Sequence, residues 1–294
     1  MDMRGSICAI ATPFLADGGL DLPAFGAALD AQLAGGSQGL VVAGSTGEAH
    51  LLDEAEFERL LAFACERVNG RIPVYAGTGE AATAKTVALT RRAAGIGADG
   101  ALVVTPYYLR PTQEGLRRHF LSVADAGDLP VLLYNVPTRT GCDLLPETVA
   151  GLRGHPRIRG IKEAVSDPER MARLIELADE EFVYLSGDDG SAIHAMLAGA
   201  AGTISVVANL VPQLFRQLCD AAVGGNAPGA RHCQAMLLPL IEALNGAPNP
   251  IAVKAGLAMI GLGTDHLRLP LVALEEGVAR ARLEKALKGL VSAI

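Results

Sequence analysis

The sequence predicts an α/β fold, a (β/α)8 TIM barrel with a C-terminal helical extension. Eight short apolar runs alternate with amphipathic stretches, and most runs are rich in Val, Ile and Leu on both faces, as buried parallel strands are. The first run ends in Ala11-Thr12-Pro13-Phe14, without the glycine-rich phosphate turn of a doubly wound sheet, which is the alternative fold. The last part of the chain has helical periodicity without a strand pattern.

The order of the elements supports one barrel domain. The predicted strands are residues 6–11, 39–43, 72–76, 100–105, 131–135, 158–162, 183–186 and 202–206. The predicted helices are residues 22–33, 53–68, 83–96, 113–126, 145–152, 168–178, 191–197 and 212–223. Parallel strands joined by right-handed helical connections close economically into a barrel, which is expected to span residues 1–224. Helices at 230–244, 250–260 and from 270 onward predict a helical domain over residues 225–294.

Composition excludes several classes of function. The chain has 294 residues, half of them hydrophobic, and a net charge of −7, so neither nucleic acid nor an anionic membrane surface is an expected partner. We expect no membrane span, because no run of 18 apolar residues occurs, and no secretory signal. Five scattered cysteines without a Cys-x-x-Cys pair indicate reduced thiols and a cytoplasmic location, and argue against a zinc cluster.

Lys162 is the most informative residue for function. It ends the sixth predicted strand, in a chain with five lysines and many more arginines. Removal from water makes a lysine amine easier to deprotonate, whereas arginine keeps its proton. An amine at a barrel mouth is therefore a candidate for Schiff-base chemistry with a ketone. The alternatives are a solvent-exposed lysine and a rival amine, Lys254, which we expect to be structural.

Other reactive groups also follow predicted strands, where barrel enzymes collect their catalytic residues. A tyrosine backed by a second hydroxyl can relay the protons that imine chemistry requires. A hydroxyl pair at a helix start can hold a small carboxylate, and an arginine fork can hold another. The residues at these strand ends are Ser45, Thr46, Tyr107, Tyr108, Tyr134, Arg139, Gly187 and Ile204.

Each of these groups also has a simpler interpretation. The Gly-Ser-Thr-Gly segment can be an ordinary turn, and the tyrosines can pack on the barrel rim. Arg139 can be a surface cation paired with Asp143. Asp188 and Asp189 lack a neighbouring histidine or glutamate at ligand spacing, so we predict helix caps and no metal site.

Two sequence blocks carry a family resemblance. Gly44-Ser45-Thr46-Gly47-Glu48 and Tyr134-Asn135-Val136-Pro137, with Lys162 following 28 residues after the tyrosine, resemble the dihydrodipicolinate synthase and N-acetylneuraminate lyase superfamily of pyruvate-dependent class I aldolases. The resemblance covers nearly the whole chain. It implies that Lys162 forms a Schiff base with pyruvate and that no cofactor is needed.

The sequence shares features with two branches of this superfamily. Thr138-Arg139-Thr140-Gly141 is similar to the synthase branch, where the arginine holds the carboxylate of L-aspartate-4-semialdehyde. Condensation with pyruvate would then give 4-hydroxy-tetrahydrodipicolinate for lysine and diaminopimelate biosynthesis. Ser45 departs from the usual threonine and occurs in the lyase branch. Cleavage of a 2-keto-3-deoxy sugar acid or N-acetylneuraminate is therefore the alternative, and a catalytically silent keto-acid-binding barrel is a third possibility.

The same resemblance implies roles for the other residues. Tyr134 would shuttle protons through Ser45 to Tyr108, which in the family reaches the active site of a neighbouring subunit. That implies at least a dimer and, in the family, usually a homotetramer built as a dimer of dimers. Thr46 would bind the pyruvate carboxylate, and Gly187 and Ile204 would line the pocket.

The resemblance finally bears on feedback by L-lysine. Inhibitable family members carry a histidine, a glutamate and an asparagine in an interface pocket, at positions that hold Phe57, Lys85 and Ala81 here. Tyr107 remains. The lysine ligand would lose a carboxylate partner and meet a like charge, so weak or no inhibition is expected.

Overall fold

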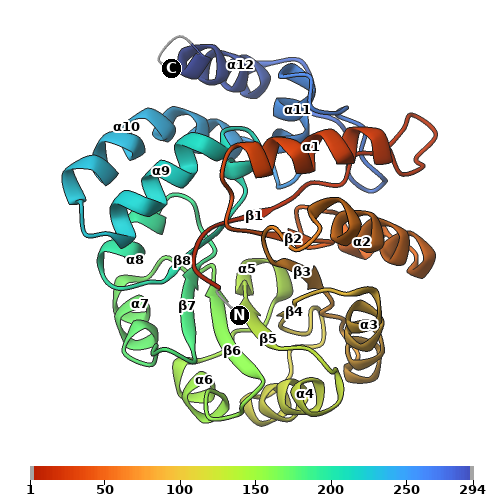
Figure 1. Cartoon of the computed structure of the whole chain (residues 1–294), viewed down its shortest axis with the longest axis vertical. Coiled ribbons are helices and arrows are strands. Elements are labelled where there is room, and N and C mark those ends of the chain that lie inside the picture. Colours follow the sequence, from red (N-terminus) through yellow and green to blue (C-terminus); the bar gives the residue numbers. More distant parts are fainter. Residues whose placement is uncertain (1–2, 292–294) are drawn as a thin grey trace.

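The computed structural model describes residues 3–291 and places eight parallel strands in a closed barrel (Figure 1). Each strand pairs with the next along the chain, and β8 pairs with β1, so the predicted barrel is confirmed. The strands are β1 Gly5–Ala9, β2 Gly39–Val42, β3 Val74–Gly77, β4 Gly100–Val104, β5 Val131–Asn135, β6 Ile158–Glu163, β7 Val183–Ser186 and β8 Gly202–Ser205.

Helices follow the strands and surround the barrel. Local sequence starts several of them: Asp53 and Glu56 form a capping box on α2, and Thr112 and Asp167 cap α4 and α7. Their apolar faces pack on the outer face of the strands in one continuous buried cluster. The helices are α1 Leu22–Ala34, α2 Glu54–Val68, α3 Thr83–Ile96, α4 Gln113–Ala126, α5 Pro137–Thr140, α6 Pro146–Leu152, α7 Pro168–Ile175, α8 Ala192–Leu197 and α9 Pro212–Val223, with short 3-10 turns η1 Ala49–Leu51 and η2 Val207–Asn209.

Side chains also fill the inside of the barrel. A second buried cluster includes Ile7, Val41, Leu102, Leu132 and Leu185. Successive residues of a strand point alternately into this interior and out towards the helices. The barrel is therefore a packed core, and a small molecule has room only at its mouth.

Three helices beyond α9 form the extension, α10 Ala227–Leu244, α11 Ile251–Met259 and α12 Val278–Val291. α10 packs against α9 and α12, and α11 packs against α12. Figure 1 shows α11 and α12 beyond α1, outside the ring of barrel helices. Within the described residues, no helix is long and apolar enough to span a membrane.

One helix prediction is wrong. The last helix begins at Val278, not at residue 270, and an irregular segment precedes it. The Arg268 guanidinium reaches the carbonyl oxygens of Gly18 and Leu51 and the carboxylate of Glu56, which holds this segment against the start of α2. Tertiary contacts therefore override the helical pattern. The sequence analysis also missed α5, whose four residues are too few to show a period.

Candidate active site

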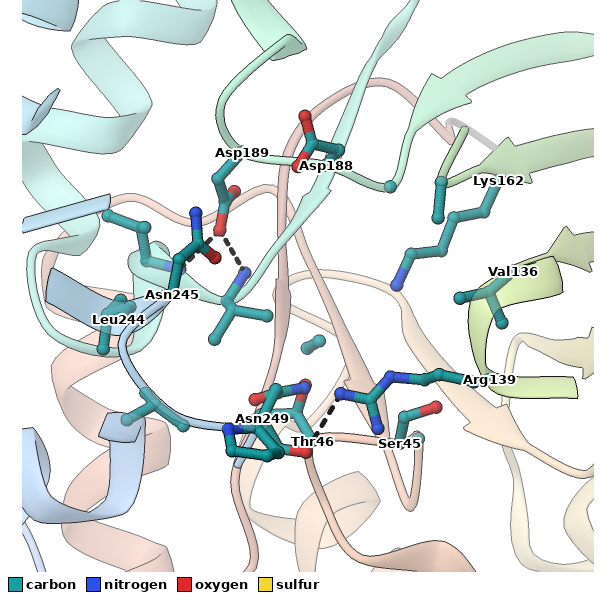
Figure 2. Close-up of a pocket in the computed structure, with 18 of the residues that line it drawn as sticks. Ser45, Thr46, Val136, Arg139, Lys162, Asp188, Asp189, Leu244, Asn245 and Asn249 are labelled. Atoms are coloured by element: carbon teal, nitrogen blue, oxygen red, sulfur yellow. Dashed lines mark hydrogen bonds between the residues drawn. The ribbon is translucent and has the colours of Figure 1, made fainter. Parts of the chain in front are cut away.

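A cavity of about 360 Å³ opens at the carboxyl ends of the strands (Figure 2). Six of the residues expected at the site line it together, although they come from different strand ends: Ser45, Thr46, Tyr134, Arg139, Lys162 and Gly187. The extension contributes further walls through Leu244, Asn245 and Asn249. The cavity therefore lies between the barrel and the extension.

Lys162 lies in this cavity on β6, only 5% exposed. Its Nζ is 4.3 Å from the centroid of the Tyr134 ring, because Tyr134 on β5 is its register partner. Among residues 3–291 it makes no ion pair, so the amine is not held by a carboxylate. A Cβ at Gly187 would come within 3.0 Å of Lys162 Cε, which explains why a glycine stands there. Lys162 is therefore not the solvent-exposed strand end of the simpler interpretation.

Lys254, the rival amine, is occupied elsewhere. Its Nζ lies 2.6 Å from Glu48 Oε1, and both side chains are fully buried. Burial lowers the pKa of Lys254, and the Glu48 carboxylate opposes this by favouring the charged amine. The structural role expected for Lys254 is thus matched by its contacts. The pair also joins α11 to the turn that carries Ser45 and Thr46.

Asn249 links the two proposed carboxylate-binding residues. Its Nδ2 donates to Thr46 Oγ1 at 3.0 Å, and its carbonyl oxygen accepts from Arg139 Nη2 at 3.0 Å. Its Oδ1 is buried and has no hydrogen-bond partner in the described part of the chain. Sequence reasoning missed this residue, because only tertiary contacts bring the segment between α10 and α11 to the barrel mouth. Arg139 does not pair with Asp143, whose carboxylate binds Arg170 instead.

The two aspartates after β7 hold backbone turns. Asp188 Oδ2 accepts from the N–H and hydroxyl of Ser191 at the start of α8. Asp189 Oδ2 accepts from the N–H groups of Val206 and Val207 at the start of η2, and burial raises the pKa of Asp189. Both aspartates therefore hold the start of a helix or turn, but the N-cap residues themselves are Ser191 and Val206. Within residues 3–291, no group of three or more His, Cys, Asp or Glu side chains is arranged to hold a metal ion.

Two of the expected site residues do not line the cavity. Ile204 is buried in the barrel interior below it, with its side chain in the interior cluster. Tyr108 is 90% exposed and lies outside the cavity of its own chain. Its neighbour Tyr107 donates to Glu80 Oε2 at 2.9 Å, and burial together with Glu80 raises the pKa of Tyr107 to about 12. Tyr107 is therefore held in a separate contact on the rim.

Comparison with known families agrees with this geometry. The model of the dihydrodipicolinate synthetase family matches residues 2–290 of the sequence. The chain belongs to this family. The match covers the barrel and most of the extension, including the segments that carry Lys162, Ser45, Thr46 and Asn249.

Individual family members are similar over almost their whole length. A 4-hydroxy-tetrahydrodipicolinate synthase from Xanthomonas axonopodis pv. citri is 59% identical over 274 residues, covering 93% of this chain and 90% of the relative. The crystal structure of a chloride-inhibited dihydrodipicolinate synthase from Acinetobacter baumannii, complexed with pyruvate, superposes with a TM-score of 0.96 at 40% identity, covering 98% and 99% of the two chains. A monomeric dihydrodipicolinate synthase variant gives a TM-score of 0.95 at 40% identity, covering 98% and 97%.

Proposed function

We propose that the chain condenses pyruvate with L-aspartate-4-semialdehyde through a Schiff base and yields 4-hydroxy-tetrahydrodipicolinate, a step in lysine and diaminopimelate biosynthesis. The observation that carries this function is the Lys162 amine, buried at the end of β6, free of an ion pair among the described residues and open to the cavity. The name shared by the relatives supports the same reaction.

The first half of the reaction is imine formation. The Lys162 amine attacks the pyruvate ketone, a C–N bond forms, and the ketone oxygen leaves as water after two proton transfers. Tyr134, whose ring lies against the amine and which lines the cavity as Ser45 does, is the proposed carrier of these protons. We assign the pyruvate carboxylate to the hydroxyl of Thr46, whose oxygen accepts a hydrogen bond from Asn249 Nδ2.

The second half forms the new carbon–carbon bond. The imine loses a methyl proton to become an enamine, whose carbon attacks the aldehyde carbon of the semialdehyde. The amino group of that substrate then attacks the imine carbon and displaces Lys162, so the ring closes and the enzyme amine is regenerated. The reaction needs no redox step and no cofactor.

Arg139 supports the semialdehyde over a sugar acid as the second substrate. Its guanidinium points into the cavity towards the same space as the Lys162 amine (Figure 2). A planar fork of this kind binds a carboxylate in a bidentate manner. The relatives' shared name also favours this substrate over the keto-sugar alternative.

The assembly and location are further parts of the proposal. We propose a homotetramer, in which the exposed Tyr108 completes the proton relay of a neighbouring subunit. The support is its position outside the cavity of its own chain, next to the exposed Leu109. The five cysteines, all free thiols in the structure, support a cytoplasmic location.

The test is borohydride reduction in the presence of pyruvate, followed by peptide mass analysis. One reduced pyruvyl adduct is expected at Lys162, and none in Lys162→Arg, because arginine keeps its proton. Parallel assays with the semialdehyde and with sugar-derived aldehydes then identify the second substrate. Protein that gains no adduct would support a catalytically silent barrel that only binds a keto acid. Turnover of a sugar-derived aldehyde alone would support the alternative reaction on a 2-keto-3-deoxy sugar acid or N-acetylneuraminate.

A further inference from the structure

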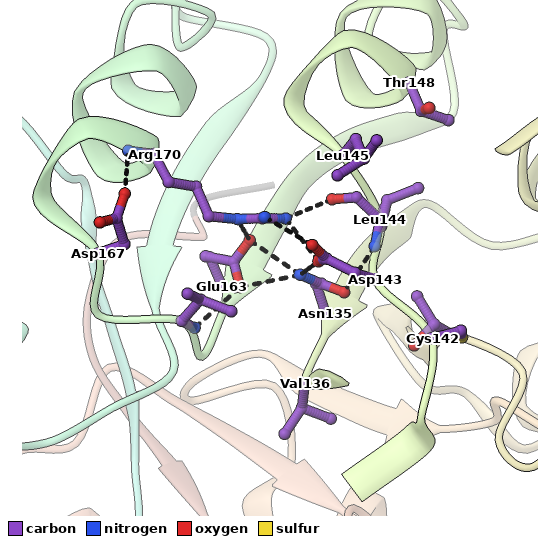
Figure 3. A network of polar contacts seen from close by, with 12 residues as sticks. Asn135, Val136, Cys142, Asp143, Leu144, Leu145, Thr148, Glu163, Asp167 and Arg170 are labelled. Atoms are coloured by element: carbon purple, nitrogen blue, oxygen red, sulfur yellow. Dashed lines mark hydrogen bonds and ion pairs between the residues drawn. The ribbon is translucent and has the colours of Figure 1, made fainter. Parts of the chain in front are cut away.

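A polar cluster of Asn135, Asp143, Glu163 and Arg170 lies at the ends of β5 and β6 (Figure 3). In the β5–β6 register, Tyr134 pairs with Lys162, and the next pair is Asn135 with Glu163. Neighbouring residues of a strand point to opposite faces, so Tyr134 and Lys162 face the barrel mouth while Asn135 and Glu163 face the helices. Tyr134 and Lys162 therefore lie on one face of these strand ends, and Asn135 and Glu163 lie on the other.

Glu163 is the centre of this cluster. Its side chain is fully buried and accepts from Arg170 Nε at 2.8 Å, from the N–H of Val165 at 2.9 Å and from Asn135 Nδ2 at 3.1 Å. Arg170 also donates to both carboxylate oxygens of Asp143 at 2.9 Å. The cluster therefore connects β6 to α7 and to the loop that follows α5.

Asn135 joins the same cluster from β5. Its Nδ2 donates to Asp143 Oδ1 at 2.8 Å and to Glu163, and its Oδ1 accepts from the N–H of Leu144 at 2.9 Å. Both ends of the amide are used, so its orientation is determined. The ends of β5 and β6 are consequently fixed to each other by side chains as well as by the strand ladder.

Stability alone does not account for such a cluster. Buried ion pairs can often be replaced by apolar side chains without loss of stability, because removing charges from water is costly. Hydrogen bonds are directional and fix the position of each strand end. Apolar side chains in their place would not fix these positions in the same way. A displacement of about 1 Å at a reacting group can cost on the order of 100-fold in rate.

We infer that Asn135, Glu163 and Arg170 are positioning residues that hold the Lys162 amine against the Tyr134 ring. This inference rests on the proposed Schiff-base function and adds residues that do not touch the substrate. Thr46 lies on the turn after β2, and Arg139 lies on α5, between the cluster residues Asn135 and Asp143. The hydrogen bonds of both side chains go to Asn249 of the extension.

Glu163→Gln is the sharpest variant. It keeps the size of the side chain but replaces one accepting oxygen by an NH₂ group that faces donors. We expect kcat and the rate of borohydride-trappable imine formation with pyruvate to fall together by about 10- to 100-fold, while KM for the semialdehyde changes less than about 3-fold. Arg170→Lys keeps the positive charge without the planar fork and is expected to show the same loss.

Glu147→Gln is the matched control. Glu147 pairs with Arg173, and this pair also links α6 to α7, but it is largely exposed and does not contact β5 or β6. Its kcat and trapping rate should equal those of the wild type. Thermal unfolding of all variants shows which are folded at the assay temperature, and Arg170→Lys serves if Glu163→Gln does not fold.

The outcomes separate the two hypotheses. Wild-type protein that gains no pyruvyl adduct would overturn the proposed function and, with it, the inference. Wild-type protein that is trapped at Lys162, together with folded Glu163→Gln or Arg170→Lys that reacts at the wild-type rate, would overturn the inference alone. The inference would also be overturned if the loss of kcat in each variant equalled the fraction of that variant that is unfolded at the assay temperature.

Discussion

At the scale of single residues, two buried lysines differ in their ion-pair partners, and we propose that this difference makes Lys162 the reactive one. Each amine lies 4.3 Å from the centroid of an aromatic ring, Tyr134 for Lys162 and Phe14 for Lys254. Lys254 is also paired with Glu48, whereas Lys162 has no ion-pair partner in the described chain. A carboxylate at 2.6 Å favours the protonated amine, which has no lone pair with which to attack a ketone. Both side chains are buried, so we attribute their proposed difference in reactivity to the carboxylate partner.

Arg139 is expected to determine the second substrate. Arg139→Ala removes the proposed carboxylate fork, and kcat/KM for the semialdehyde should fall more than about 100-fold. Pyruvate trapping at Lys162 should persist, because that step does not use the fork. Arg118→Ala, which removes a largely exposed arginine on α4, is the control. Steady-state kinetics with both substrates varied would show an error in the assignment if Arg139→Ala kept near-normal kcat/KM.

His119 is expected to make stability depend on pH. Burial lowers the pKa of His119 to about 4 from its usual 6.5, and its Nδ1 lies 3.0 Å from Thr83 Oγ1. The folded protein therefore binds this proton less tightly than the unfolded chain does. Stability is fully present above pH 6.5 and is lost as the pH falls towards 4, by about 2 kcal/mol at pH 5.

Urea unfolding of the wild type and of His119→Gln at pH 7.5 and pH 5 measures this loss. The variant should lose less free energy of unfolding between the two pH values, by about the same 2 kcal/mol. Identical pH dependence in both proteins would show that His119 does not titrate as described.

At the scale of elements, the extension is part of the site and not an appendage. The segment between α10 and α11 brings Asn249 to Thr46 and Arg139, and α11 brings Lys254 to Glu48. Arg268, in the irregular segment, donates its backbone N–H to the other Glu48 oxygen at 3.2 Å. The turn that carries Ser45 and Thr46 is thus held from outside the barrel.

Loss of the Lys254 amine should destabilise the whole chain. Lys254→Met leaves Glu48 buried without its cation, and we expect the free energy of unfolding to fall by about 3–5 kcal/mol. The double variant Lys254→Met/Glu48→Gln should recover much of this, since it removes the buried charge as well. Lys288→Met, which breaks the exposed Lys288–Glu284 pair, should cost less than about 1 kcal/mol. Equal effects of Lys254→Met and Lys288→Met in urea unfolding would contradict the prediction.

At the scale of the whole molecule, the rim of the barrel carries apolar side chains outside the cavity. Tyr108 and Leu109 follow β4 and are exposed, as are Leu269 and Val272 in the segment before α12. Tyr107 lines a second cavity together with Pro270 and Leu271, so the two segments lie close together. This rim is where we expect a second copy of the chain.

Tyr108→Phe tests whether the partner completes the site. We expect sedimentation velocity to show a dimer or larger species for both proteins, because the ring remains. Loss of the hydroxyl should lower kcat at least about 10-fold if it relays protons. Full activity of Tyr108→Phe, or full activity of a wild-type monomer, would argue that each chain works alone.

Feedback by L-lysine should be weak or absent. The rim holds Tyr107 in a hydrogen bond with Glu80, and the His50 ring lies against it with centroids 4.5 Å apart. Phe57 and Lys85 offer no carboxylate for a lysine ligand. Steady-state rates with increasing L-lysine check this, and half-inhibition below about 1 mM would contradict it.

Much of this architecture was predictable from the sequence. The strands at 131–135 and 183–186 and the helices at 83–96, 113–126 and 212–223 have the predicted bounds. Buried parallel strands and amphipathic helices carry their pattern in consecutive residues, so local reading suffices. The family resemblance is also carried by short segments. One contains Ser45 and Thr46, another contains Tyr134, and Lys162 follows that tyrosine at a fixed spacing.

The remaining features depend on contacts between distant segments. Asn249 contacts Thr46, Lys254 contacts Glu48, and Arg170 contacts Asp143, and in each case a segment far away in the sequence supplies the partner. The irregular course before α12 has the same origin. The type of a side chain determines what it can bind, but packing of the closed barrel against its extension decides which partner it has. That packing decides which buried lysine, Lys254, is paired with a carboxylate.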